Sequence, residues 1–157
     1  KNSTKKILVK IPPLSYSGKI LRIKPHSPFN LKELIVVLRV AHHPLVEINR
    51  RGITIEIPIT VEEAVSGAVI RVPTVEDTTL LKVPPGTQSG TVLRVSKAGP
   101  RREDGTPSDI FYKLMIYVPS SYTAVGLKDK VKDLSSYYER EVRKNLPSSL
   151  GELLKKE

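Results

Sequence analysis

The sequence contains no cysteine and no tryptophan, and aromatic residues make up only 5% of it. Without cysteine the chain can form neither a disulfide bond nor a cysteine-ligated zinc site. This absence fits a reducing compartment, and we predict a cytoplasmic location. No apolar run approaches the roughly 20 residues that a membrane-spanning helix requires, so the sequence predicts no membrane partner.

Two stretches of the sequence that lie 72 positions apart are nearly the same. Residues 11–23 align with residues 83–95, and six of these thirteen positions are identical. Each stretch contains a Pro-Pro turn that ends in Ser-Gly, and each is followed by a second apolar run, at 34–40 and 110–118. Similarity at a fixed spacing indicates a duplicated structural unit.

The duplication predicts how the chain is divided. We expect a mainly β fold in which two tandem small β-sandwich-like domains are followed by a C-terminal amphipathic helix. The predicted domains are residues 1–51 and 52–124, and the helical segment is residues 125–157. Because only 39% of the residues are hydrophobic, each domain is expected to have a thin core between two β layers.

Alternating apolar residues predict half-buried strands at 7–11 and 53–57. The run at 34–40 is apolar at nearly every position, which predicts a strand covered on both faces or a central strand in a thin sandwich. Further strands are expected at 20–23, 68–72, 79–83, 91–95 and 109–118.

A short helix is predicted after the strand at 53–57. Thr60 and Glu63 have the spacing of a capping box, in which each side chain accepts a hydrogen bond from the other residue's backbone N–H. Gly67 suits the left-handed residue that ends such a helix.

The last segment carries apolar residues at steps of three and four, separated by charged ones. They are Leu127, Val131, Leu134, Tyr138, Val142 and Leu146. This apolar stripe predicts one amphipathic helix, which is covered either by the chain's own second β domain or by a second copy of the chain.

The net charge of +10 is concentrated at the N-terminal end, where residues 1–24 carry seven Lys or Arg and no acidic residue. Such a basic end is suited to nucleic acid or to an acidic partner. The alternative is a solvated strand edge on which Lys prevents unwanted pairing. Tyr16 is the only aromatic residue there that is able to stack on a base.

The sequence predicts no enzyme and no cofactor. It has no cysteine nucleophile, no Gly-x-Ser-x-Gly motif and no phosphate loop of the Walker type. His42 and His43 are adjacent, so in a strand their side chains point to opposite faces and cannot share a metal. What remains is surface: Leu45 and Val46 lie at the seam between the two repeats, where core packing and peptide binding are equally good interpretations.

Several of these motifs resemble the C-terminal substrate-binding region of DnaJ-type J-domain co-chaperones, most closely the CbpA (curved DNA-binding protein A) branch. The similarity covers roughly residues 6–120 and is specific, because its short motifs follow one another at the spacing of the family. They are Gly52–Gly67, Val72–Thr74, Leu81–Gly90 and Leu93–Val95, together with His43-Pro44-Leu45.

The resemblance implies two β-sandwich-like domains followed by a segment that forms a homodimer through the apolar stripe. It also implies that unfolded polypeptide binds a shallow groove on the first domain and is passed to a DnaK-type chaperone. In this chain the groove residues are expected to be Leu45, Val46 and Ile48. Val46 stands where the family commonly has Phe, and Ile48 and Gly52 stand where it often has Arg and Asp.

Other parts of such co-chaperones are not found in this sequence. There is no J domain with its His-Pro-Asp tripeptide, because His43-Pro44 is followed by Leu45, and there is no Gly/Phe-rich linker. We therefore expect the chain to be a C-terminal part of a J-domain protein that binds unfolded polypeptide. The alternative is a nucleic-acid-binding module, with curved DNA as the ligand and the basic end as the site.

Overall fold

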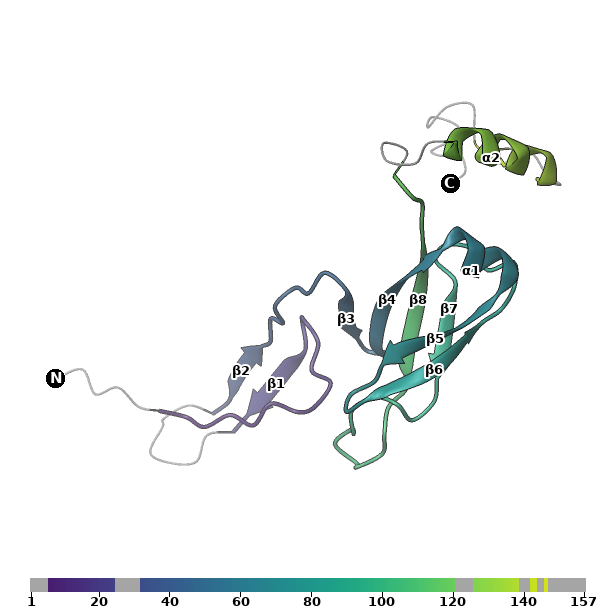
Figure 1. Cartoon of the computed structure of the whole chain (residues 1–157). Helices are drawn as coiled ribbons and strands as arrows, with labels where there is room; N and C mark the ends of the chain where they lie inside the picture. The colour runs from purple at the N-terminus through teal and green to yellow at the C-terminus, as the bar shows by residue number, and fades with distance from the viewer. Residues whose placement is uncertain (1–5, 25–31, 121–125, 139–141, 144–145, 147–157) are drawn as a thin grey trace. The chain divides into compact units, whose positions relative to one another are not determined.

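The computed structural model describes residues 6–24, 32–120, 126–138, 142–143 and 146. The chain forms two compact units, Lys1–Val118 and Pro119–Glu157. The first unit is mainly β and the second contains a short helix, as the sequence predicts (Figure 1). No helix in the described ranges is long and apolar enough to cross a membrane.

A four-stranded sheet forms the largest part of the first unit. Its strands are β3 (Val46–Asn49), β4 (Gly52–Thr60), β8 (Ile110–Tyr117) and β7 (Val92–Val95), in this order across the sheet. β4 and β8 are parallel, whereas the β3–β4 and β7–β8 pairs are antiparallel. The sheet therefore pairs residues that are 57 positions apart in the chain, such as Glu56 and Lys113, and a parallel pairing of this kind needs a crossover connection.

The crossover contains a short helix, α1 (Val61–Ser66), and a hairpin of β5 (Ala68–Pro73) and β6 (Thr78–Val83). These elements and the sheet share one core, which gives this part of the unit two layers (Figure 1). The core residues are Ile59, Ala64, Val72, Leu81, Val83, Ile110, Tyr112 and Leu114. The strands predicted at 53–57, 68–72, 79–83, 91–95 and 109–118 are confirmed in position.

The capping box at the start of α1 is confirmed. The Thr60 Oγ1 accepts from the Glu63 N–H at 3.1 Å, and the Thr60 N–H donates to the Glu63 Oε2 at 2.7 Å. Gly67 ends the helix with a positive φ of 78°, but its ψ of 156° is extended rather than left-handed helical. The chain leaves α1 directly into β5, so Gly67 links the helix to the strand that begins at Ala68.

A separate two-stranded hairpin is formed by β1 (Ile20–Ile23) and β2 (Leu34–Val37). Two expectations are wrong here. Residues 7–11 form no strand, because no described segment pairs with them. The run at 34–40 is not covered on both faces: Ile35 and Val37 are each 58% exposed, since a two-stranded hairpin covers at most one of its faces.

The internal repeat is confirmed at the level of single hydrogen bonds. In the first copy Gly18 N–H donates to Leu38 C=O at 2.9 Å, and in the second Gly90 N–H donates to Leu114 C=O at 2.7 Å. Both glycines have a positive φ, 88° and 86°. Ser15 and Thr87 likewise donate their hydroxyls, each at 2.6 Å, to the carbonyl of the first proline in their Pro-Pro turns. The same sequence motif thus forms the same local structure twice.

The second unit contains α2 (Leu127–Leu134), followed by a 3-10 turn at Ser135–Tyr137. The single helix predicted to reach Leu146 is wrong, because Tyr138 is already extended at φ −78° and ψ 109°. Ser135 and Ser136 donate their hydroxyls to carbonyls three residues earlier, at 2.7 and 2.6 Å. Serine side chains that bond the backbone in this way compete with helical hydrogen bonds.

Candidate functional site

An open groove of about 600 Å³ lies in the first unit, between residues 40–44 and the sheet. The peptide-binding residues predicted from the sequence, Leu45, Val46 and Ile48, all line it. The other lining residues are Ser17, Val40, Ala41, His42, His43, Pro44, Glu47, Thr54, Glu56 and Lys113. The structure therefore brings the three predicted residues to the wall of one cavity.

The three predicted residues differ in how far they are available to a ligand. Leu45 precedes β3 and is 50% exposed. Val46 and Ile48 are half-buried and lie opposite Ile55 and Ile53 in the β3–β4 pair. They therefore share the face of the sheet that carries the core isoleucines of β4, and Leu45 is the most accessible apolar side chain of the three.

β3 lies at the edge of the four-stranded sheet, and no described strand pairs with its outer side. An edge strand presents unpaired backbone N–H and C=O groups to which an extended chain can add. The strand is anchored on its inner side by β4, where the Glu56 N–H donates to the Leu45 carbonyl at 2.9 Å. The groove thus combines an accessible leucine with a free strand edge.

Charged residues form one side of the groove. The sequence analysis did not predict these residues as part of the site. The parallel register places Glu56 of β4 opposite Lys113 of β8, and the Lys113 Nζ donates to the Glu56 Oε1 at 2.8 Å. This hydrogen bond raises the pKa of Lys113, with a smaller contribution from the charge of Glu47. Lys113 is the only charged residue in the apolar run 110–118. This isolated charge is the feature of the sequence that could have identified Lys113 as a candidate site residue.

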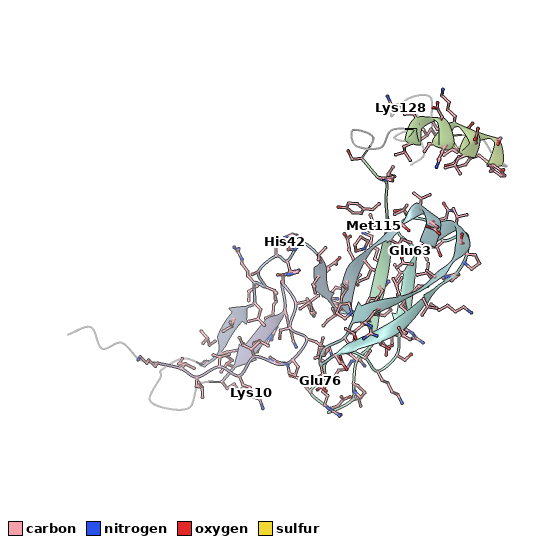
Figure 2. The ribbon with its side chains drawn as sticks, viewed as in Figure 1. Lys10, His42, Glu63, Glu76, Met115 and Lys128 are labelled. Atoms are coloured by element: carbon pink, nitrogen blue, oxygen red, sulfur yellow. The ribbon has the colours of Figure 1, made fainter. Side chains whose placement is uncertain are left out.

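His42 and His43 lie in the segment that links β2 to β3, and both are exposed. Figure 2 labels His42 in this segment. The His43 Nδ1 accepts from the Leu45 N–H at 3.2 Å. His43 therefore contacts the backbone of Leu45 at the entrance of β3.

The apolar stripe predicted for dimerisation is divided by the structure. Leu127, Val131 and Leu134 lie on α2, where Val131 is 49% and Leu134 42% exposed. Tyr138, Val142 and Leu146 are more exposed still but follow the end of the helix. Only the first half of the stripe is thus a helical face.

The fold and the groove define a class of protein: a mainly β chain built from a repeated Pro-Pro/Ser-Gly unit, with an open groove beside an edge strand. The sequence matches the family DnaJ C terminal domain over residues 1–119. The chain belongs to this family, which confirms the resemblance seen in its motifs.

Curated relatives agree with this assignment. The chain is 31% identical over 148 residues to the chaperone protein DnaJ of Clostridioides difficile, covering 90% of this chain and 37% of the relative. It is 32% identical over 124 residues to a curved DNA-binding protein of Pseudomonas putida, covering 76% and 39%. The curved DNA-binding protein of Escherichia coli is 31% identical over 142 residues, covering 86% and 46%. The chain thus spans less than half the length of these relatives.

Proposed function

We propose that this chain is a non-enzymatic, substrate-binding part of a co-chaperone. In this proposal it binds unfolded polypeptide through Leu45, Val46 and Ile48, forms a homodimer through its C-terminal stripe, and delivers its clients to a DnaK-type chaperone in the cytoplasm. The observation that carries the proposal is the groove beside β3, in a chain whose family and relatives include chaperone proteins named DnaJ.

The geometry supports an extended, partly apolar ligand. A segment without secondary structure adds to the free edge of β3 through backbone hydrogen bonds, which do not depend on its sequence. Its apolar side chains then contact the exposed Leu45, while Val46 and Ile48 offer the backbone edge of β3 and turn their side chains to the core face of the sheet. The preference is for unfolded polypeptide because a folded protein has already paired its strands and buried its apolar side chains.

Substitution of Leu45 tests this groove. Leu45→Glu places a charge on the most accessible apolar residue of the groove without changing the core. Because burying a leucine contributes about 1.5–3 kcal/mol, we expect the affinity for a denatured client to fall about tenfold. The measurement is the aggregation of a chemically denatured client protein, followed by light scattering at increasing amounts of the chain.

Leu80→Glu is the matched control, because Leu80 is 64% exposed on β6 and does not line the groove. The control should suppress aggregation as well as the wild type does. Equal suppression by Leu45→Glu and the wild type would contradict a client site at this groove.

Nucleic-acid binding by the basic residues 1–24 is the second candidate, and two observations favour it. This end carries most of the net charge, and two of the relatives are named curved DNA-binding proteins. Titration with a curved DNA duplex at rising salt tests it, because affinity for phosphates falls steeply with salt. Apolar peptide binding should change little over the same range.

A further inference from the structure

A second, smaller cleft of about 220 Å³ lies at the tip of the β3–β4 hairpin and has a strongly basic lining. Four cationic side chains line it, with one carboxylate, that of Glu103. The cations are Lys19, Arg50, Arg51 and Arg102. They come from three separate parts of the first unit, so the fold and not the sequence brings them together.

The turn at the hairpin tip does not depend on the side chains of Arg50 and Arg51. Asn49 and Gly52 are paired, so Arg50 and Arg51 occupy the two loop positions. The turn itself is stabilised by other residues: the Asn49 Oδ1 accepts from the Arg51 N–H at 2.9 Å, and Gly52 has a φ of 143°. Two-residue hairpin loops favour Asn, Asp and Gly, and two exposed arginines contribute nothing to that geometry.

Tyr16 holds one of the arginines in place. The Arg50 Nε donates to the Tyr16 Oη at 3.1 Å, and the guanidinium carbon lies 5.8 Å from the centre of the tyrosine ring. This contact uses only the Nε–H, so the terminal amino groups of Arg50 remain as hydrogen-bond donors. A guanidinium that is already oriented loses less entropy when it binds a planar anion.

None of the four cleft cations forms an ion pair within the described ranges. The ion pairs found there join Arg94 to Asp109, Lys113 to Glu56 and Lys132 to Asp129. The pKa of Asp104, next to Glu103, is lowered mainly by hydrogen bonds from Thr106, with a smaller contribution from the charge of Arg102. Glu103 leaves an excess of positive charge in a concave site, where the potentials of neighbouring charges add.

We propose that this basic cleft binds an acidic segment of a partner polypeptide, whose Asp or Glu carboxylates form bidentate hydrogen bonds with Arg50 and Arg51. Carboxylate and guanidinium groups match in this planar, two-bond geometry. Nucleic acid fits the site less well, because a duplex is too wide to enter a small concave cleft. Tyr16 is the one aromatic residue of the cleft and already carries the Arg50 guanidinium, so the cleft lacks the series of aromatic side chains on which successive bases of a single strand stack.

The cleft is tested with a fluorescein-labelled peptide of alternating Glu and Gly residues, titrated with the whole chain and followed by fluorescence anisotropy. The double variant Arg50→Gln plus Arg51→Gln should bind about tenfold or more weakly, since each lost charge-assisted bond contributes measurably to affinity. Both residues are exposed, so circular dichroism should show the fold of the wild type.

Arg71→Gln plus Lys82→Gln is the matched control, because it removes the same charge from the exposed face of β5 and β6, away from the cleft. Binding within about twofold of the wild type supports the proposal. An equal loss in both double variants would show attraction by net charge alone and overturn it. A DNA duplex that binds wild type more tightly than the peptide and loses binding in the Arg50/Arg51 variant would also overturn it. Because Leu45 does not line this cleft, a failure here leaves the client groove untouched.

Discussion

At the scale of single residues, the structure uses a few polar groups to join distant parts of the first unit. Tyr112 is fully buried in β8, and its hydroxyl donates to the Pro73 carbonyl on β5 at 2.6 Å. This bond connects the sheet to the hairpin that covers it. Apolar contacts between two layers are not directional and do not fix their relative position. A buried hydrogen bond between the layers does fix it.

Tyr112→Phe should lower the free energy of unfolding at neutral pH by about 1 kcal/mol, because the hydrogen bond is lost while the ring remains. Burial raises the pKa of the Tyr112 hydroxyl. The unfolded state therefore loses this proton first, and wild-type stability should fall as the pH rises above about 10. Tyr112→Phe has no hydroxyl to ionise at this position, so its free energy of unfolding should fall less over the same pH range.

Urea unfolding followed by circular dichroism at neutral pH and above pH ~10 measures both effects. Tyr117→Phe is the control, since Tyr117 is exposed on the same strand. If the two variants follow the same pH dependence, the role of the Tyr112 hydroxyl is contradicted.

At the scale of elements, α2 is the helix whose apolar face is not covered by any of the residues that the structure describes. None of its residues is buried, although Leu127, Val131 and Leu134 follow the helical period. A helix of this length is marginal alone in water, so its face requires a partner. We propose that the partner is a second copy of the chain, in line with the dimer implied by the family resemblance.

Val131→Asp plus Leu134→Asp should convert a homodimer into a folded monomer. Each apolar side chain buried at an interface contributes about 1.5–3 kcal/mol, so the two changes together should weaken dimerisation by at least a hundredfold. Light scattering or analytical ultracentrifugation measures the mass, and circular dichroism reports whether the β unit is intact.

Lys128→Gln plus Lys132→Gln is the control for the added negative charge, because both lysines are exposed on α2 and lie outside the stripe. It should stay dimeric. A wild-type chain that is monomeric at tens of micromolar concentrations would contradict the dimer, and complete unfolding of the aspartate variant would identify the stripe as intramolecular core.

At the scale of the whole molecule, the chain combines an apolar groove beside β3 with a basic cleft at the tip of the same hairpin. Both are on the first unit, and both are built where the two copies of the repeat meet along the chain. β3 thus carries residues of each site: Val46 and Ile48 line the groove, and Asn49 lines the cleft. The domain boundary predicted between residues 51 and 52 lies in this hairpin turn and stays a prediction.

We expect that this chain alone does not stimulate ATP hydrolysis by a DnaK-type chaperone. The family resemblance assigns that step to a His-Pro-Asp tripeptide, which the sequence lacks. The substitution Leu45→Asp creates a His-Pro-Asp sequence at residues 43–45. Because this tripeptide lies at the entrance of β3 and not in a J domain, the variant should stimulate ATP hydrolysis no more than the wild type. A single-turnover ATPase assay compares both with a complete J-domain protein. Stimulation by either chain alone would contradict the prediction.

Local sequence patterns determined the parts of this fold that depend on neighbouring residues. The Pro-Pro/Ser-Gly turns, the Thr60–Glu63 cap and the strands of the second repeat were all predictable, because their hydrogen bonds and periodicities span only a few residues. The groove residues Leu45, Val46 and Ile48 were predicted by resemblance, and the structure places them together without testing their role.

Only the tertiary structure decided the contacts between distant segments. The parallel β4–β8 pairing opposes Glu56 and Lys113, and the fold brings Arg50 to Tyr16 across 34 positions. It also decided that residues 7–11 form no strand and that the stripe leaves its helix at Tyr138. A strand exists only with a partner, and a helix continues only where its backbone bonds outcompete side-chain ones. Periodicity reports what a segment is able to form, whereas packing selects which partners it meets.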